Sequence, residues 1–311
     1  MTFKIFLQKV EKKLKWEWGN RASLLFRINR KVHRWFITHS KNPNPGSAPY
    51  ISGDTFRTIA KHVFDENRNI VPEEVSGGDF LFVKIYFIEE FFETVHPQIK
   101  NPYVLITHNG DTTVDDKLAQ NVDEKNIRWY AQNVNIDHPK ITPIPIGLEN
   151  LDYYNHGVIS RVIKIQRKNI LKKNKILFGF EIGTNPTERV PALDALLETT
   201  SAEKIKGRLT AKKYLRKLAQ YKFVASPPGN GIDCHRTWEA MYTKTVPIVK
   251  DSLLMRHFYD LGLPLFIVKN WDELKQLDEN KLAEIYHQLA PRFSNLALYF
   301  SYWQDIIMTT K

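Results

Sequence analysis

A polar segment at residues 226–240, SPPGNGIDCHRTWEA, combines residue types that bind phosphate groups. It follows the apolar run YKFVAS and precedes TWEAMYTK, so the pattern predicts a loop that leads from a strand into a helix. Gly229 and Gly231 permit a close approach of the backbone to a ligand, and the amides at a helix start attract anions. Arg236 adds a planar charged group that suits phosphate oxygens.

Glu239 lies three residues after Arg236, about one helical turn further on, so both side chains can face one ligand. Arg236 would bind a diphosphate and Glu239 two ribose hydroxyl groups, so the pair indicates a nucleoside diphosphate site. The alternative is that the two side chains pair with each other on a helix surface, while the prolines and glycine only turn the chain. The further donor-binding candidates in this segment are Ser226, Asn230, Asp233 and His235.

A second polar loop, FGFEIGTNPTERVPAL at residues 178–193, runs from a predicted strand into a predicted helix. Thr184 and Arg189 are further donor-binding candidates, because side chains at the carboxyl end of a parallel strand can reach the same diphosphate. The alternative is a capped helix with Arg189 exposed to solvent.

The longer segment SPPGNGIDCHRTWEAMYTKTVPIVKD resembles the donor-binding segment of exostosin-like glycosyltransferases, which have the GT-B architecture of two Rossmann-like domains. The clear resemblance covers about residues 205–270, and the N-terminal half agrees only in its general α/β pattern. It implies a nucleotide sugar as donor, with uracil as the expected base and guanine as the alternative. The diphosphate and ribose contacts that it implies fall to Gly229, Asn230, Gly231, Arg236 and Glu239.

Sugar transfer with inversion needs a base beside the acceptor hydroxyl. Each carboxylate candidate has a structural alternative, with Asp54 as a helix N-cap, Asp111 in a turn and Glu149 on the surface. A retaining enzyme would need no such base, so the stereochemistry stays open. The catalytic candidates on loops of the N-terminal half are Asp111 as first choice, then Asp54 and Glu149, with His108 beside them.

No aspartate pair has the compact spacing that holds a divalent cation in the other major glycosyltransferase fold. The nearest run, DTTVDD at residues 111–116, is spaced differently, and the histidines lack metal-ligand spacing. We therefore expect no metal and no cofactor. Arg236 and the helix-start amides would stabilise the departing diphosphate instead.

Strand-like and helix-like segments alternate from residue 50 onward, including a helix expected over residues 55–66. This alternation predicts parallel sheets with helices on both faces. The expected fold is α/β and GT-B-like, with two doubly wound Rossmann-type domains facing a cleft and a basic helical N-terminal arm. The expected parts are residues 1–48 (arm and linker), 49–165 (acceptor domain), 166–290 (nucleotide-sugar domain) and 291–311 (a C-terminal helix packing back on the first domain).

The net charge of +11 is concentrated in residues 1–40, which hold ten Lys or Arg against two Glu. Apolar residues recur there at helical spacing, and basic and aromatic residues together favour an anionic membrane surface. The alternative is a helical pair packed on the body with a solvated basic face. The residues expected to contact a membrane are Lys12, Lys13, Trp16, Trp18, Arg30, Lys31 and Trp35.

These features predict a glycosyltransferase that extends a surface polysaccharide or a lipid-linked glycan. The single cysteine, Cys234, and the lack of a signal-like or membrane-spanning run favour a cytoplasmic protein, peripheral on the inner face of the membrane. One alternative is a non-catalytic nucleotide-sugar-binding or scaffold protein. Another is a nucleic-acid-binding protein, against which the nearly balanced charge outside the arm argues.

Overall fold

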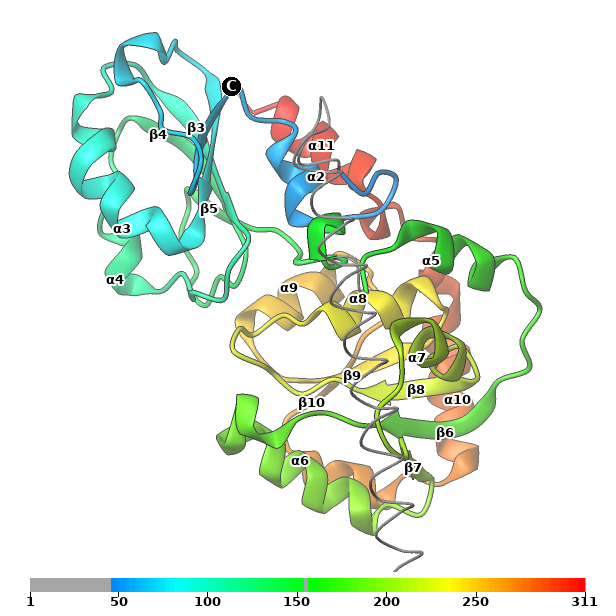
Figure 1. Ribbon diagram of the computed structural model, residues 1–311. Coiled ribbons are helices and arrows are strands. Elements are labelled where there is room, and N and C mark those ends of the chain that lie inside the picture. Colours follow the sequence, from blue (N-terminus) through cyan, green and yellow to red (C-terminus); the bar gives the residue numbers. More distant parts are fainter. Residues whose placement is uncertain (1–45, 154–155, 311) are drawn as a thin grey trace, which may run out of the picture.

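The computed structural model describes residues 46–153 and 156–310, which form two five-stranded parallel sheets with helices packed against them (Figure 1). The predicted α/β fold with two parallel sheets is therefore confirmed. In the first sheet the strands follow one another in chain order. They are β1 (His62–Phe64), β2 (Asp79–Lys84), β3 (Tyr103–His108), β4 (Asn126–Ala131) and β5 (Ile141–Pro143).

Both faces of the first sheet are buried, because its strands are almost continuously apolar. Leu105 of β3 faces a core with Phe91 and Trp129, whereas its neighbour Ile106 faces a second core with Phe56. The helical segments of this half are α2 (Gly53–Arg57), η1 (Pro72–Glu74), η2 (Ile85–Phe87), α3 (Ile88–Glu90), η3 (Phe91–Val95), η4 (His96–Gln98), α4 (Asp116–Ala119) and η5 (Leu151–Tyr153).

The helix expected over residues 55–66 is wrong in its second half. Helix α2 ends at Arg57, and His62, Val63 and Phe64 pair with β2 as a parallel strand. All three residues of β1 are buried, and Val63 and Phe64 belong to the apolar cores on opposite faces of the sheet. Sheet pairing therefore outweighs the helical spacing of the apolar residues.

The second sheet has the order β7-β6-β8-β9-β10, so the strand order reverses at β6. Ligands of such open sheets bind beyond the carboxyl ends of the strands at this reversal, here β6 and β8. The strands are β6 (Lys173–Phe178), β7 (Ala202–Lys204), β8 (Tyr221–Ala225), β9 (Val246–Lys250) and β10 (Phe266–Val268). The helices are α5 (Ile159–Gln166), η6 (Ile182–Thr184), α6 (Pro186–Glu198), α7 (Ala211–Leu218), α8 (His235–Tyr242), α9 (Leu253–Asp260), η7 (Trp271–Gln276) and α10 (Glu279–Leu289).

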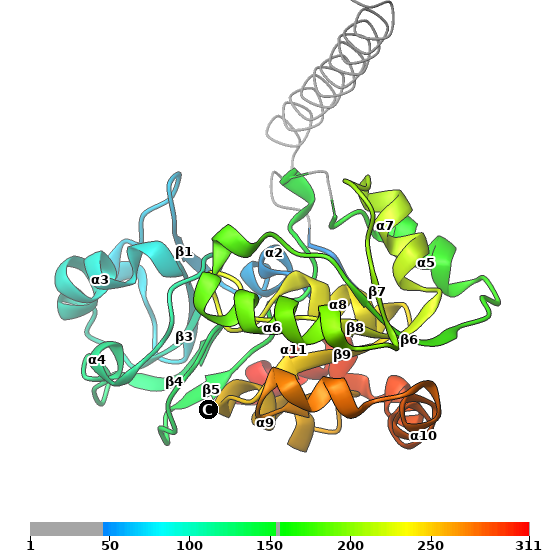
Figure 2. The ribbon, with the colours of Figure 1, turned by 90° about the horizontal axis from the view of Figure 1, so that it is seen from below.

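A continuous apolar core joins the two halves, and α11 (Phe300–Met308) is part of it. The chain reaches α11 from α10 through η8 (Ala290–Ser294) and η9 (Leu296–Leu298). Helix α11 lies beside α2 (Figures 1 and 2), and the Phe56 and Phe300 rings are 5.6 Å apart. The Tyr130 hydroxyl of β4 lies 2.5 Å from the Thr310 hydroxyl. The C-terminal segment therefore covers one face of the first sheet together with α2.

The arm residues Lys12, Lys13, Trp16, Trp18, Arg30, Lys31 and Trp35 lie outside the described residues. Within residues 46–153 and 156–310, no helix has both the length and the apolar composition needed to cross a bilayer.

Gly147 is a position where the backbone requires glycine. Its φ is +67°, and a Cβ there would collide with the carbonyl of Ile51, which accepts a hydrogen bond from the Leu148 N–H at 2.7 Å. Gly78 offers a matched control, because its φ of +82° is similar but nothing lies within 4 Å of the added Cβ.

We expect Gly78→Ala to lower the free energy of unfolding by about 1–2 kcal/mol through backbone strain alone. Gly147→Ala should lower the free energy of unfolding by about 1–3 kcal/mol more than Gly78→Ala does, because the backbone at Ile51 must also move. Urea unfolding of the two variants measures the difference, and equal losses would contradict a steric role for Ile51.

Candidate functional site

Two cavities, each of about 510 Å³, lie at the carboxyl ends of the two sheets. The N-terminal cavity is lined by the residues that follow β1 to β5 and by α2. The C-terminal cavity is lined by the residues that follow β6 and β7 and by α7 and α8. Glu149 and His235 line both cavities, so the two spaces meet at these side chains.

The C-terminal cavity lies at the reversal of strand order, as expected for a ligand site in this kind of sheet. Arg236 and Glu239 of α8 both line it. Arg236 donates to the Gly179 carbonyl at 3.2 Å, just beyond β6, and its guanidinium lies 5.9 Å from the Phe180 ring. The alternative in which Arg236 and Glu239 only pair with each other is wrong, because each has a different partner.

The partner of Glu239 is His156. The Glu239 side chain is buried, and its Oε1 lies 2.8 Å from His156 Nδ1. Burial alone lowers the pKa of His156, but the hydrogen bond with Glu239 and the charge of that carboxylate outweigh burial and raise it. The other oxygen of Glu239 makes no hydrogen bond within the described residues, so it is available to ligand hydroxyl groups.

Tyr214 of α7 also lines the C-terminal cavity, close to the charge of Arg236. Its ring packs edge-on against His156 with 5.7 Å between the ring centroids. Phe178, Phe180, Ile205 and Leu209 give the same cavity an apolar portion beside its charged groups. This combination suits a ligand with a flat base and an anionic, hydroxyl-bearing remainder.

The start of α8 is left without a side-chain cap. Its N-cap residue, Cys234, makes no cap hydrogen bond, whereas Ser52, Asn185, Thr210 and Ser252 cap α2, α6, α7 and α9. The amides of His235 and Arg236 therefore remain for an anion, in line with the positive end of the helix dipole, whereas the Thr237 N–H donates to the Cys234 carbonyl at 2.9 Å.

Much of the glycine loop before α8 joins the two halves of the protein. The Asp233 carboxylate is buried and accepts from the Ile146 N–H of the first half at 2.9 Å. It also accepts from Trp238 Nε1 at 2.8 Å and from the Cys234 N–H at 2.8 Å. His235 Nδ1 donates to the Gly147 carbonyl at 2.9 Å.

Asp233 was predicted as a donor ligand, but all three of its partners are protein groups and it lines neither cavity. Burial raises its pKa to about 6 against the opposing effect of these donors. Gly231 fits closely against Asn133 of the first half, and Asn230 donates to Asp111 at 3.2 Å. The loop thus aligns the halves as well as leading into α8.

Arg189 and Thr184 line neither cavity. Arg189 is buried and donates to the Pro228 carbonyl at 2.9 Å and to the Glu181 carbonyl at 2.7 Å. Asn185 donates to the Gly229 carbonyl at 2.9 Å. The loop before α6 therefore supports the glycine loop before α8. The alternative interpretation, in which Arg189 is exposed to solvent, is wrong. The Ser226 hydroxyl lies 3.0 Å from the Thr237 hydroxyl and is buried, so it fastens the loop to α8.

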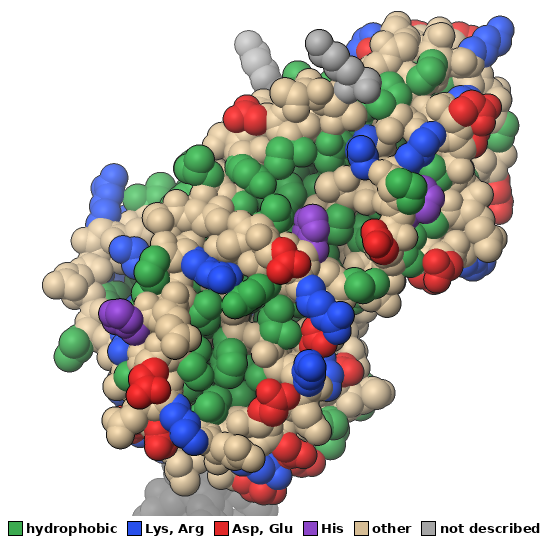
Figure 3. Space-filling model, turned by 180° about the vertical axis from the view of Figure 1, so that it is seen from behind, with side chains coloured by type: hydrophobic (Ala, Val, Ile, Leu, Met, Phe, Trp, Pro, Cys, Tyr) green, Lys and Arg blue, Asp and Glu red, His purple; other side chains and the backbone are tan. Residues whose placement is uncertain are grey.

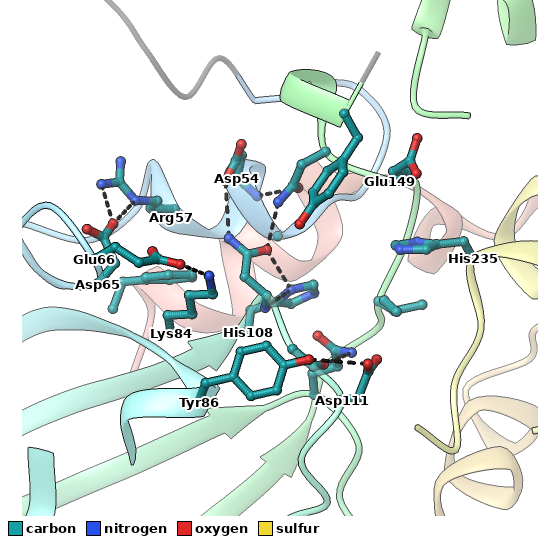
Figure 4. Close-up of a pocket in the computed structure, with 18 of the residues that line it drawn as sticks. Asp54, Arg57, Asp65, Glu66, Lys84, Tyr86, His108, Asp111, Glu149 and His235 are labelled. Carbon is teal, nitrogen blue, oxygen red and sulfur yellow. Dashed lines mark hydrogen bonds and ion pairs between the residues drawn. The ribbon is translucent and has the colours of Figure 1, made fainter. Parts of the chain in front are cut away.

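The catalytic candidates all line the N-terminal cavity (Figure 4). Asp111 accepts from the Tyr86 hydroxyl at 3.2 Å. Asp54 is buried and accepts from Asn109 Nδ2 at 3.2 Å, and it is not an N-cap, because Ser52 caps α2. Among the candidates only Glu149 also lines the C-terminal cavity.

His108 is unsuited to act as a base. Its Nε2 donates to the Pro145 carbonyl at 3.1 Å, and its Nδ1 accepts from the Asn109 N–H at 2.7 Å. Burial lowers its pKa to about 4, so the ring is neutral at pH 7. Both nitrogens are therefore occupied in supporting the loop after β3, which corrects the predicted catalytic role.

Glu149 accepts from the His156 N–H at 2.6 Å through Oε2. In Figure 4 it lies above His235, which projects from the second half of the protein. Because His235 Nδ1 donates to a carbonyl, its other nitrogen, Nε2, is an acceptor in the neutral ring. Two proton-accepting groups thus stand where the cavities meet. Among residues 46–153 and 156–310, no group of three or more His, Cys, Asp or Glu could hold a metal ion.

No protein-family model matches the chain. Over 103 residues it is 28% identical to zebrafish (Danio rerio) ribitol-5-phosphate xylosyltransferase 1, a match that covers 30% of this chain and 24% of the relative. The match therefore spans about a quarter of the length of that relative.

Solved glycosyltransferase structures overlap with the chain loosely. OtsA without ligand has a TM-score of 0.47 at 10% identity, over 76% of this chain and 73% of OtsA. The E. coli trehalose-6-phosphate structure with UDP-2-fluoro glucose has a TM-score of 0.46 at 9% identity, over 76% and 73%. Anabaena HepE with UDP-glucose has a TM-score of 0.39 at 11% identity, over 75% and 74%. These overlaps are too loose to assign a substrate.

His156 and Tyr214 are the site residues that the sequence analysis missed. His156 is 83 residues from Glu239, so no local spacing connects them. Tyr214 lies in a basic helix whose apolar residues look like ordinary core positions. A turn sequence, NHG, at residues 155–157 was the only local signal for His156.

We expect Asp233→Asn to lower the free energy of unfolding by about 1–3 kcal/mol. The asparagine NH₂ group would replace one of the two carboxylate oxygens, both of which accept from N–H donors. The donors on that side would then be buried without an acceptor. Asp137→Asn is the matched control, because Asp137 is exposed and the chemical change is the same. Urea unfolding measures the stability of both variants. Equal stability would contradict the conclusion that Asp233 joins the two halves.

The His156–Glu239 pair should make stability depend on pH. Because the folded-state pKa of His156 is raised, the pair contributes fully below the ordinary histidine value of about 6.5. Its contribution is lost as the pH rises through the raised pKa. The stability difference between wild type and His156→Gln, measured by thermal unfolding across this range, should therefore shrink with rising pH. A difference that grows would contradict the pairing.

Proposed function

We propose that this protein is a glycosyltransferase that binds a nucleoside diphosphate sugar in the C-terminal cavity and a glycan acceptor in the N-terminal cavity. The observation that carries the proposal is the meeting of two cavities, one from each sheet, at Glu149 and His235. Transfer between two bound molecules requires such a junction, because the acceptor hydroxyl must lie beside the anomeric carbon of the donor.

The donor cavity contains groups for each part of a nucleotide sugar. Arg236 and the uncapped amides of α8 would bind the diphosphate, and the open oxygen of Glu239 would accept the ribose hydroxyl groups. The apolar portion around Phe180 would hold the base. As the bond to the anomeric carbon breaks, charge grows on the diphosphate, and Arg236 would stabilise it. We propose UDP as the nucleotide and transfer without a metal ion.

The acceptor cavity favours a hydroxyl-rich molecule over a phosphorylated one. Among its described lining residues, five carboxylates stand against the cations Arg57 and Lys84. Arg57 is paired with Asp65 at 2.8 Å and Lys84 with Glu66, so neither cation is left without a counter-charge. We propose a polysaccharide or lipid-linked glycan as acceptor, used by a cytoplasmic protein at the inner face of the membrane.

Glu149 is the proposed base of an inverting transfer. It would take the proton of the acceptor hydroxyl while the acceptor oxygen bonds to the anomeric carbon and the diphosphate leaves. His235 lies beside it at the junction and would orient the reacting groups. Asp111, the first choice from the sequence, lines only the acceptor cavity.

Calorimetric titration with UDP, GDP, CMP and ADP tests donor binding. We expect tight binding of one diphosphate, weakened about 100-fold or more in the Arg236→Ala, Glu239→Ala double variant, since two charge-assisted contacts are lost. The control is Arg256→Ala, Glu284→Ala, which removes the same residue types at exposed positions that line neither cavity. Failure of folded wild type to bind any of the four would overturn the proposal.

Release of the nucleotide from the bound donor, measured with a panel of glycan acceptors, tests the base. We expect Glu149→Gln to reduce transfer by about 10²–10⁴-fold with donor affinity unchanged, because the amide keeps the bond to His156 but takes no proton. Asp111→Asn should reduce the transfer rate far less than Glu149→Gln does. If Asp111→Asn reduces transfer more than Glu149→Gln does, Asp111 is the base instead. Donor binding by wild type without any transfer would favour the non-catalytic alternative.

A further inference from the structure

A groove of about 610 Å³ lies between α5 and α7, away from the two cavities. The two helices lie side by side at one edge of the C-terminal half (Figures 1 and 2). Among residues 46–153 and 156–310, no acidic residue lines the groove. Its basic lining residues are Arg161, Lys164, Arg167, Lys168, Lys212 and Arg216, and we call the space the basic groove.

Helical spacing places these charges on one side of each helix. Arg161, Lys164 and Lys168 recur at three and four residues along α5 and its C-terminal end, while Val162 and Ile165 are buried. In α7, Lys212 and Arg216 are four residues apart and exposed. The two helices therefore bring their basic faces together.

Five of the six basic side chains of the groove form no ion pair with the part of the chain that the structure describes. These five residues are Lys164, Arg167, Lys168, Lys212 and Arg216. The neighbouring Lys173 and Lys217 both pair with Glu203, at 3.3 Å and 2.7 Å. On the face shown in Figure 3, Lys and Arg side chains are interspersed with Asp and Glu. A groove that concentrates these five cations attracts an anionic partner from outside.

The remaining lining residues decide which anion fits. Val158, Ile165 and Leu215 give the groove an aliphatic floor, and Ser160 adds an uncharged polar group. None of the described residues that line it is aromatic, so these residues offer no platform for stacking nucleic-acid bases. Phosphate groups at basic walls and glycerol or acyl carbons on an aliphatic floor are the parts of an anionic lipid.

We propose that the basic groove binds the phosphate headgroups of anionic lipids and so attaches this protein to an anionic membrane surface. The lining residues of the groove are not among residues 1–40, and the proposal does not depend on the proposed function. Helix α7 lies between the groove and the C-terminal cavity, to which it contributes Tyr214. Binding at the groove would therefore hold this cavity at a fixed position above the bilayer.

Co-sedimentation of the full chain with vesicles tests the proposal. Wild type should bind mixed phosphatidylglycerol–phosphatidylcholine vesicles and not pure phosphatidylcholine vesicles. The Lys164→Glu, Lys168→Glu, Arg216→Glu variant should bind the mixed vesicles about 100-fold more weakly, since each basic residue near such a surface contributes about fivefold. The matched control is Lys100→Glu, Lys269→Glu, Lys281→Glu, which makes the same charge change at exposed positions outside the groove.

Two further measurements separate lipid binding at the groove from misfolding of the variants and from membrane contact by residues 1–40. Thermal unfolding checks that both triple variants fold. The groove substitutions are also made in a Lys12→Glu, Lys13→Glu, Lys31→Glu background, where the residual vesicle binding should be lost. Groove and control variants that bind equally in both backgrounds would overturn the proposal and leave residues 1–40 as the membrane contact.

Competition identifies the ligand class. Inorganic phosphate at matched phosphate concentration should displace the protein from mixed vesicles far less than added anionic vesicles do. If inorganic phosphate displaces it equally, the groove is a site for free phosphate and the lipid assignment is wrong. If a short RNA binds more tightly than the vesicles and the groove variant loses that binding, the groove is a nucleic-acid site and the proposal is likewise overturned.

Discussion

The buried carboxylate of Asp233 is the interaction on which the arrangement of both cavities depends. It accepts hydrogen bonds from Ile146 in one half and from Trp238 in the other, and so fixes the start of α8 relative to the loop after β5. Around it lie the contacts of His235 with Gly147 and of Asn230 with Asp111. A buried carboxylate is stable only with such donors, so the contacts across the two halves must form together.

These contacts between the two halves explain why the glycine loop holds so many polar residues. The residues before α8 align the two halves, whereas Arg236 and Glu239 within α8 face the C-terminal cavity. One segment therefore both builds the junction and lines the site beside it. The side chains at the junction itself, Glu149 and His235, come from different halves, so any change in the angle between the sheets would change their separation.

The sequence was most informative where the chemistry is local. Arg236 and Glu239 could be assigned to one cavity because one helical turn separates them, and strand–loop–helix order placed them at a carboxyl end. His156 could not be found, because its link to Glu239 exists only after the second half folds. Asp233 was misassigned because a carboxylate in a glycine loop has the same local pattern whether it binds a ligand or the protein. The strand at His62–Phe64 was missed because its pairing with β2 is a tertiary contact.

The position of α11 has a consequence for biosynthesis. The face of the first sheet that carries Val104, Ile106 and Tyr130 is covered by α2 and by α11, whose residues come after the whole second half. The ribosome must therefore translate beyond residue 308 before this face can be buried, although its strands emerge much earlier. Until then the nascent first half exposes apolar surface, which makes it a natural substrate for chaperones that bind growing chains.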